Sequence, residues 1–396
     1  MSKRIVHVGT FDESLSFQQL DTNGDWSMSG NHLHKYKSDR INIMPYQRFL
    51  SERDDWFYYI PYTDTPSLET KFDVDDIIPQ PVLNSIRTGK CKLIFHFYNE
   101  SFMEDHTLLC FHRFIDRITQ DHLIPIKKIY WMLEPYDGPE IYQDFLNRHN
   151  IEGVNIVKHP TYGITAIDRD GIDTHDVKKC RFIYPNRGAR PSRSYLGLWL
   201  WKHGIDVNMS CSNDLTGPML DYCVKEYGID NEITEIDKQN FLDLLPLTID
   251  DIDLDTQNDQ AIATVGNAKF LLSMERAGIY IISETLYEEP GRFITEKFVK
   301  ALLAQKPFIM LGQHRYLEML RECGYKTFKP YIDETYDTIS DHTKRLHAVC
   351  REISRLNDMD DLSFHQNMYE MQKIAEYNFN HYKTRPSPEA FMDELF

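Results

Sequence analysis

The sequence predicts an α/β protein with two blocks, each built on a parallel sheet, and two further helices at the end. The chain has 396 residues, which is long for one hydrophobic core and sufficient for two domains of ordinary size. Short apolar runs alternate with amphipathic helical runs, and this alternation is typical of parallel sheets covered by helices. With 41% hydrophobic and 27% charged residues, the composition is that of a globular protein.

The first block, residues 1–176, opens with a predicted strand at Arg4–Val8 that ends at Gly9. The sequence that follows is polar to about residue 88, and we expect it to be irregular. Apolar runs then predict strands at Cys91–Tyr98, Ile126–Leu133 and Val154–Val157, and periodic segments predict helices at His106–Thr119 and Pro139–His149. Strands and helices in this order predict a parallel sheet.

The second block, residues 177–335, repeats the alternation. The predicted strands are Arg181–Tyr184, Ile279–Ser283 and Pro307–Leu311, and the predicted helices are Ser194–His203, Thr295–Gln305 and Tyr316–Cys323. The helix at Thr295–Gln305 is amphipathic, because Phe298, Val299, Leu302 and Leu303 fall on one face. An acidic loop, Thr248–Asp259, interrupts the block.

Residues 336–396 form the last segment, which predicts two amphipathic helices. Their apolar positions are Leu346, Val349, Ile353 and Leu356 in one helix, and Phe364, Met368, Met371 and Ala375 in the other.

The net charge excludes one class of function. The chain has 44 Lys and Arg against 61 Asp and Glu, a net charge of −17 with neutral histidine. Such a protein repels polyanions at long range, so a dedicated non-specific nucleic-acid binder is excluded. The seven dispersed cysteines indicate reduced thiols. With no secretory signal and no run long enough to span a bilayer, we expect a soluble cytoplasmic protein without a membrane span.

The segment Phe293–Phe298 (Phe-Ile-Thr-Glu-Lys-Phe) leads into a predicted helix. The first turn of a helix exposes backbone N–H groups and carries partial positive charge, which suits a phosphate. Lys297 would add a full charge, and the two oxygens of Glu296 suit a ribose diol. In the alternative, Glu296 complements the helix dipole and Lys297 lies in solvent.

A basic island, residues 177–205, contains no Asp or Glu. Its basic residues are Lys178, Lys179, Arg181, Arg187, Arg190, Arg193 and Lys202. The loop Asn186–Arg193 lies between a strand and a helix, where open α/β sheets bind ligands, and Arg suits bidentate contact with phosphate. The alternative is a solvated loop that pairs with the acidic remainder of the chain.

Three of these segments together resemble a known family. Ser283–Thr285 (Ser-Glu-Thr), Phe293–Phe298 and Pro307–Gly312 are similar to the donor-binding stretch of the family 10, α1,3-fucosyltransferase-like glycosyltransferases. Asn186–Arg193 and Leu320–Phe328 resemble the branch of that family found in large DNA viruses and phages. The resemblance covers roughly residues 178–340.

The resemblance implies a GT-B fold, in which two Rossmann-like domains face each other across a cleft. The donor would bind the C-terminal domain and the acceptor the N-terminal one, with the C-terminal helices at the junction. No cofactor beyond a nucleotide-sugar donor is implied. Thr285 stands where the family has Asn, so the donor is left open, with a GDP-sugar as the first expectation.

The resemblance also implies roles for single residues at the donor site. Thr295, Glu296 and Lys297 would all belong to the donor site, where Glu296 would bind the donor ribose and Lys297 the donor phosphates. Glu284 would lie beside the sugar. The diphosphate leaving group would be neutralised by Arg193, with Arg187 and Arg190 as alternatives.

The implied reaction is an inverting displacement that needs no metal. A general base must accept the proton of the acceptor hydroxyl, and it should follow a strand of the first block. Glu100 is the first candidate and Glu134 the second, and either could instead be a surface carboxylate. Asp251 and Asp253 match an Asp-x-Asp metal motif but lie in the acidic loop, so we expect them to be solvated.

Three functions follow from these observations. The first is transfer of a hexose or pentose from a nucleotide-sugar to a glycan or a similar hydroxyl acceptor. The second is phage-type glycosylation of hydroxymethylated DNA, in the host cytoplasm if the chain is viral. The third is a non-catalytic protein that binds a sugar-nucleotide or a glycan. The sequence leaves the sugar, the base, the acceptor and the oligomeric state open.

Overall fold

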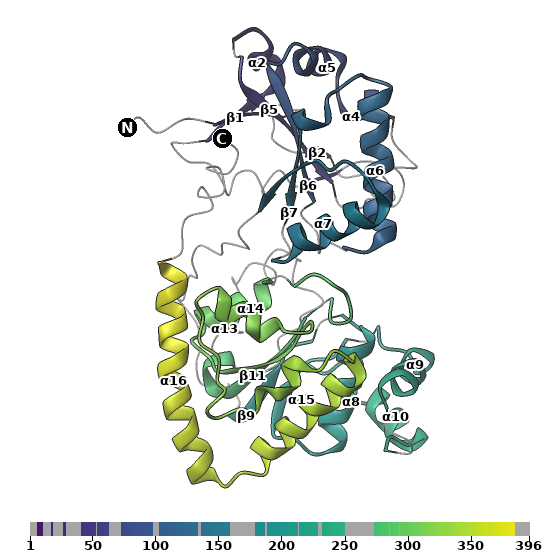
Figure 1. The fold of residues 1–396 in the computed structure, drawn as a ribbon. Coiled ribbons are helices and arrows are strands. Elements are labelled where there is room, and N and C mark those ends of the chain that lie inside the picture. The colour runs from purple at the N-terminus through teal and green to yellow at the C-terminus, as the bar shows by residue number, and fades with distance from the viewer. Residues whose placement is uncertain are drawn as a thin grey trace. The chain divides into compact units, whose positions relative to one another are not determined.

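Figure 1 shows the fold of the chain as a computed structural model. The residues that the structure describes are 6–10, 17–18, 27–28, 41–52, 54–62, 73–97, 103–133, 136–158, 179–186, 188–212, 214–228, 232–249, 273–284, 286–292 and 294–384.

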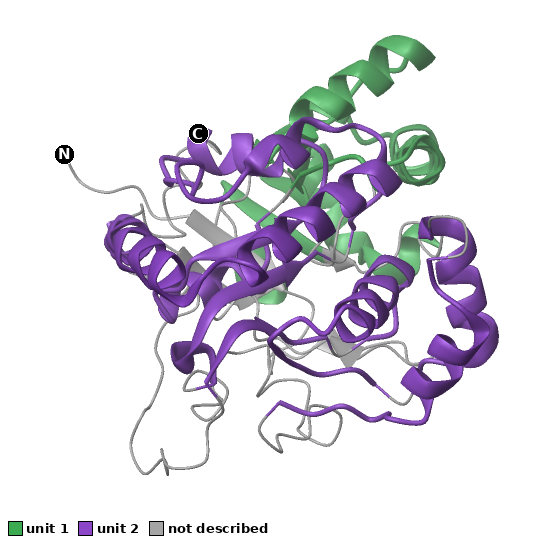
Figure 2. Cartoon of the chain, turned by 90° about the horizontal axis from the view of Figure 1, so that it is seen from below, with its two compact units in different colours: residues 1–163, 289–293, 386–396 green, residues 164–288, 294–385 purple. Residues whose placement is uncertain are grey.

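The chain divides into two compact units, coloured separately in Figure 2. The first comprises Met1–Gly163, Glu289–Phe293 and Pro386–Phe396, and the second comprises Ile164–Glu288 and Ile294–Arg385. The predicted α/β class is confirmed, because each unit contains a sheet whose paired strands are all parallel.

The first unit is built on a six-stranded sheet in the order β4-β1-β5-β6-β7-β8. Its strands are β1 Val6–Thr10, β4 Ile41–Pro45, β5 Trp56–Tyr62, β6 Cys91–Phe97, β7 Ile129–Leu133 and β8 Asn155–Lys158. Its helices are α2 Tyr46–Glu52, α4 Val74–Ile77, α5 Gln80–Arg87, η1 Ile126–Lys128, α6 Asp105–Gln120 and α7 Gly138–His149. A short antiparallel pair joins β2 Phe17–Gln18 to β3 Ser27–Met28.

From Cys91 onward the predicted elements of this unit are confirmed, although η1 replaces the start of the strand expected at Ile126–Leu133. The prediction of irregular sequence up to about residue 88 is wrong, because β4, α2, β5, α4 and α5 lie there. Strand β5 escaped recognition since Pro61 interrupts its run of aromatic residues, and proline counts against a central strand.

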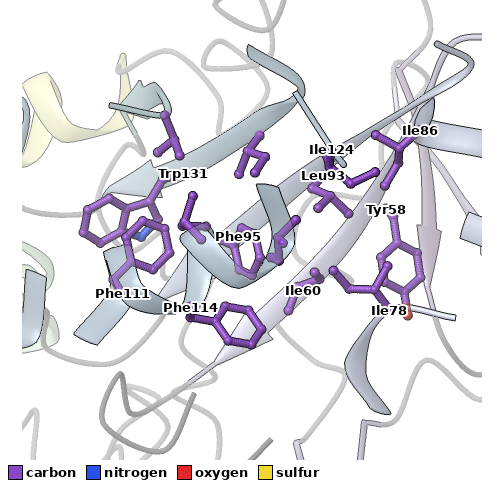
Figure 3. Close-up of a cluster of buried hydrophobic side chains, with 14 of the residues drawn as sticks. Tyr58, Ile60, Ile78, Ile86, Leu93, Phe95, Phe111, Phe114, Ile124 and Trp131 are labelled. Carbon is purple, nitrogen blue, oxygen red and sulfur yellow. The ribbon is translucent and has the colours of Figure 1, made fainter. Parts of the chain in front are cut away.

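One face of this sheet forms the core of the first unit with α5 and α6, as Figure 3 shows. Trp131 on β7 stacks on Phe111 of α6, with ring centroids 4.3 Å apart. Phe95 of β6 meets Phe111 and Phe114 edge to face. Side chains alternate along a strand, so the apolar residues at every second position of β5, β6 and β7 all face these helices.

The second unit contains a four-stranded sheet in the order β10-β9-β11-β12. Its strands are β9 Cys180–Tyr184, β10 Val207–Met209, β11 Ala277–Ser283 and β12 Phe308–Leu311. Its helices are α8 Pro191–Lys202, α9 Gly217–Tyr227, α10 Glu235–Leu242, α13 Glu296–Leu303, α14 Tyr316–Glu322, η2 Glu334–Thr338, α15 His342–Asn357 and α16 Asp361–Lys383. The predicted strands and helices of this unit and the two C-terminal helices are confirmed, while β10, α9 and α10 were not predicted.

The two C-terminal helices pack within the second unit. Helix α15 contacts η2, α8 and β12, and α16 contacts α13. A place for these helices at the junction of two domains stays a prediction. No helix among the described residues is both long enough and apolar enough to cross a bilayer.

Candidate functional site

The candidate site lies at the carboxyl edge of the second unit's sheet. Because β9, β11 and β12 are parallel, their carboxyl ends meet at this edge. Helix α8 follows β9 and α13 follows β11, so the first turns of both helices begin there as well. Ligands of open α/β sheets bind outside the carboxyl ends of the strands. We refer to the residues directly after these strands, with the first turns of α8 and α13, as the carboxyl edge.

Glu284 is the central residue of the carboxyl edge. It follows β11 directly, and its N–H donates to the main-chain oxygen of Leu311 at 2.9 Å. The hydroxyl of Thr295 is 2.9 Å from both of its carboxylate oxygens, and the hydroxyl of Tyr316 donates to Oε1 at 3.1 Å. The side chain of Glu284 is only 1% exposed. A buried carboxylate needs such donors, since an unpaired charge in the interior is costly.

Thr295 joins Glu284 to the start of α13. It is the N-cap of the helix, and its hydroxyl accepts the N–H of Lys297 at 3.1 Å while donating to Glu284. The ammonium of Lys297 lies 3.7 Å from Oε2 of Glu284. The carboxylate therefore faces both a positive side chain and the positive end of a helix dipole.

Arg193 lies in the first turn of α8, on the other helix of the carboxyl edge. This turn contains no acidic residue, and the N-cap, Arg190, makes no side-chain capping bond. Arg193 is 8% exposed, and its main-chain oxygen accepts the hydroxyl of Tyr184 at 3.0 Å. Burial raises the pKa of Tyr184, while its neighbours Ser283 and Arg193 act in the opposite direction. The Arg193 charge is thus within electrostatic reach of the end of β9.

Two residues of the basic island have structural roles away from the carboxyl edge. Arg181, in β9, donates to the main-chain oxygens of Leu356, Asn357 and Met359. Lys202 at the end of α8 pairs with Asp237 at 2.6 Å. The alternative reading, in which the island pairs with acidic and polar groups of the remaining chain, therefore holds for these two residues.

The structure brings Glu284, Thr295 and Lys297 into direct contact and places Arg193 and Arg190 at the same sheet edge. Four other predicted residues lie outside the described part. Three of them, Arg187, Glu100 and Glu134, lie outside it entirely. The fourth, Glu296, begins α13, and only its side chain is not described. The motif at Asp251 and Asp253 also lies outside it. The roles of all these residues stay predictions.

Sequence reasoning missed two features of the carboxyl edge. One is Tyr316, which was assigned to a helix without a role for its hydroxyl. The other is a pair of buried side-chain amides, Asn186 after β9 and Gln313 after β12. Within the described part of the chain, neither the Oδ1 of Asn186 nor either amide atom of Gln313 has a hydrogen-bond partner. A polar residue just past an apolar strand is the signal that could have indicated Gln313.

The chemistry available at this edge is that of charge and hydrogen bonding. An arginine, a lysine and the N–H groups of two helix starts can together bind an anion such as a phosphate. Among the described residues, no three His, Cys, Asp or Glu side chains group as they would around a metal ion.

Comparisons with known proteins give distant similarities. No protein-family model matches the chain, and no curated protein matches it. Solved structures that are similar include a GtfA/B complex, with 12% identity, a TM-score of 0.43, and coverage of 93% of this chain and 60% of that one. This chain thus spans less than two thirds of that protein's length.

Two further structures are UDP-forming α,α-trehalose-phosphate synthases. The enzyme from Burkholderia vietnamiensis has 11% identity and a TM-score of 0.42, with 91% of this chain and 80% of that one covered. The enzyme from Burkholderia xenovorans has 8% identity and a TM-score of 0.42, with 88% and 78% covered. Since the TM-scores of these three structures all lie below 0.5, conclusions about function have to come from the site itself.

Proposed function

We propose that this chain is a glycosyltransferase that binds a nucleotide-sugar at the carboxyl edge and transfers the sugar to a hydroxyl acceptor. One observation carries the proposal: two helix N-termini, one with Arg193 and the other with Lys297, begin at the same edge of one parallel sheet. A diphosphate has two adjacent anionic groups, which suits paired helix starts with a guanidinium and an ammonium.

The two helix starts would have different roles. The first turn of α8 has Arg193 and no acidic residue, so it is the more cationic and would take most of the diphosphate charge. Lys297 is 3.7 Å from Glu284, which offsets part of its charge. Lys297 would therefore contribute directed N–H donors, and Glu296 would accept the ribose hydroxyls, as in the family 10 enzymes that the sequence resembles.

The reaction we propose is an inverting displacement. The acceptor oxygen attacks the anomeric carbon, the bond from that carbon to the diphosphate oxygen breaks, and a general base takes the hydroxyl proton. Arg193, Lys297 and the first turn of α8 would stabilise the charge on the departing diphosphate. Glu100, or in its place Glu134, is proposed as the base. A GT-B arrangement, a GDP-sugar donor, a virus or phage origin and a cytoplasmic location belong to the same proposal.

Calorimetric titration of the full chain with UDP and GDP tests the donor site. Wild type should bind at least one of the two, and Arg193→Ala should weaken binding about 10- to 100-fold, because a hydrogen bond to a charged group is lost. Arg351→Ala, an exposed arginine on α15, is the matched control and should leave binding unchanged. If no nucleoside diphosphate binds wild type at millimolar concentration, the proposal fails.

The acceptor is tested separately, with the donor that binds best. A neutral oligosaccharide should gain the mass of one sugar. The net charge of −17 disfavours hydroxymethylated DNA as the acceptor, and a mass gain on such DNA would reverse that assignment. Donor binding without hydrolysis or transfer on any acceptor would favour the non-catalytic alternative.

A further inference from the structure

The contacts of Glu284 indicate that it acts on Lys297. Its carboxylate is enclosed by donors from three places: Thr295 before α13, Lys297 in α13 and Tyr316 at the start of α14. Glu284 and Thr295 are 1% exposed and Tyr316 is fully buried, while the side chain of Lys297 is 18% exposed. Lys297 is therefore the member of this group that a ligand reaches most easily.

A lysine has a flexible four-carbon side chain and acts as a point charge, so its position must be set by its surroundings. Fixing such a side chain in one position costs conformational entropy. When the side chain is already fixed in the free protein, its entropy is not lost again on binding, and the ligand binds more tightly. The carboxylate of Glu284, 3.7 Å away, can hold the ammonium in this way, provided that the carboxylate itself has one orientation.

Tyr316 gives the carboxylate that orientation. Its hydroxyl donates to Oε1, which leaves Oε2 as the oxygen that faces Lys297. The hydroxyl of Thr295 contacts both oxygens and does not distinguish them. Of these three contacts, the bond from Tyr316 is the one that separates the role of Oε1 from that of Oε2.

The ring of Tyr316 is itself tightly held. A Cβ on Gly312 would lie 3.0 Å from two atoms of the ring, so the turn after β12 contacts the ring directly. The N–H of Tyr316 donates to the main-chain oxygen of Gln313 at 3.1 Å. Arg345 holds the same turn through the oxygen of Gly312, also at 3.1 Å.

We propose that Tyr316 is a positioning residue of the donor site, acting through Glu284 to hold the ammonium of Lys297 where the diphosphate of a nucleotide-sugar binds. The inference rests on the proposed function and assigns to Glu284 the orientation of Lys297 rather than contact with the sugar.

The test is a double-mutant cycle on the full chain, read out as the Kd of UDP and GDP. Tyr316→Phe should weaken binding about 5- to 10-fold, through the loss of one hydrogen bond to a charged group. In the Lys297→Ala background the same substitution should have almost no effect, since the residue through which it acts is gone. A merely structural role would weaken binding equally in both backgrounds.

Tyr336→Phe is the matched control. Tyr336 is also a buried tyrosine of the second unit, and its hydroxyl accepts the N–H of Met310 on β12 at 3.4 Å. This variant should lose stability without losing affinity. Should Tyr316→Phe fail to fold, Glu284→Gln keeps an acceptor for the Tyr316 hydroxyl but removes the charge that holds the ammonium, and should weaken binding in wild type but not in Lys297→Ala.

The outcomes separate the two proposals. If Lys297→Ala raises the Kd but Tyr316→Phe, like Tyr336→Phe, leaves it unchanged, the positioning role is overturned and the donor site stands. An effect of Tyr316→Phe that persists in full without Lys297 also overturns it. If wild type binds neither nucleotide, the proposed function fails, and the inference with it.

Discussion

Arg181 donates a hydrogen bond of 2.6 Å to the main-chain oxygen of Met359, and so joins β9 to the turn between α15 and α16. The same guanidinium donates to the oxygens of Leu356 and Asn357 and lies over the ring of Phe364. Residues about 175 positions apart in the sequence are thereby held together.

Arg181→Ala should therefore destabilise the second unit. The substitution leaves two carbonyl groups at the end of α15 and one in the following turn without this donor, and we expect a loss of about 2–4 kcal/mol in the free energy of unfolding. Urea denaturation followed by circular dichroism measures it. Arg351→Ala, on the exposed face of α15, should change the value by less than about 0.5 kcal/mol. Equal losses in the two variants would contradict the assigned role of Arg181.

The first unit should lose stability in mild acid because of two buried histidines. Burial lowers the pKa of His96 to about 3 and that of His112 to about 4. Below about pH 6.5 the unfolded chain binds protons that the folded chain does not, so stability is complete above that pH and falls as the pH drops. At pH 5 the loss is about 2 kcal/mol for each histidine.

Urea denaturation at pH 7.5, 6 and 5 tests this dependence. His112→Gln should lower stability at all three values but should reduce its slope with pH. His106→Gln removes an exposed histidine of the same helix, α6, and should retain the slope of the wild type. If His112→Gln has the same slope as the wild type, the pKa of His112 is not lowered in the fold.

Two Gly→Ala substitutions in the second unit should change its stability in opposite directions. At Gly312 the added Cβ would lie 3.0 Å from the Tyr316 ring, which is fully buried, so we expect a loss of about 1–3 kcal/mol. At Gly197, inside α8, the nearest atom would be 3.7 Å away, and alanine should stabilise the helix by about 0.5–1 kcal/mol.

Melting temperatures of the two variants measure the difference. Gly312→Ala should also weaken nucleotide binding, since the ring that it displaces is bonded to Glu284. A stable Gly312→Ala protein with unchanged affinity would show that the ring can shift without cost.

Thiol accessibility gives a simple test of the fold. Of the seven cysteines, all free, six are buried and only Cys323 is partly exposed. Burial also raises the pKa of Cys91, Cys223 and Cys350, which lowers their reactivity. Reaction with an aromatic disulfide reagent at pH 8 should show one fast thiol in the native protein and seven in urea. Cys323→Ser should remove the fast phase, and several fast thiols in the native protein would contradict the packing.

The sequence was sufficient for elements whose pattern is local. Strand β11 was predicted from an apolar run and helix α13 from a 3.6-residue period, and each pattern can be recognised within about ten residues. Strand β5 was not predicted, because Pro61 counts against a central strand, yet β5 lies between β1 and β6 in the sheet. Tertiary pairing determines that strand more than its own composition does.

The candidate site was predictable only in part, for a similar reason. Lys297 was identified from its place at a helix start, which sequence spacing reveals. The bond from Tyr316 to Glu284 joins residues 32 positions apart, and nothing in the spacing indicates it. Arg181 and Lys202 looked like members of an anion site because their partners, Met359 and Asp237, are distant in the sequence.

The way the chain alternates between its two units limits how they can be taken apart. It passes from the first unit to the second after Gly163, returns for Glu289–Phe293, and returns again from Pro386 onward. No single proteolytic cut yields two intact pieces, and a fragment that ends at Gly163 lacks two segments of its own unit. Chimeras that exchange one unit between related proteins would have to be spliced at all four crossings.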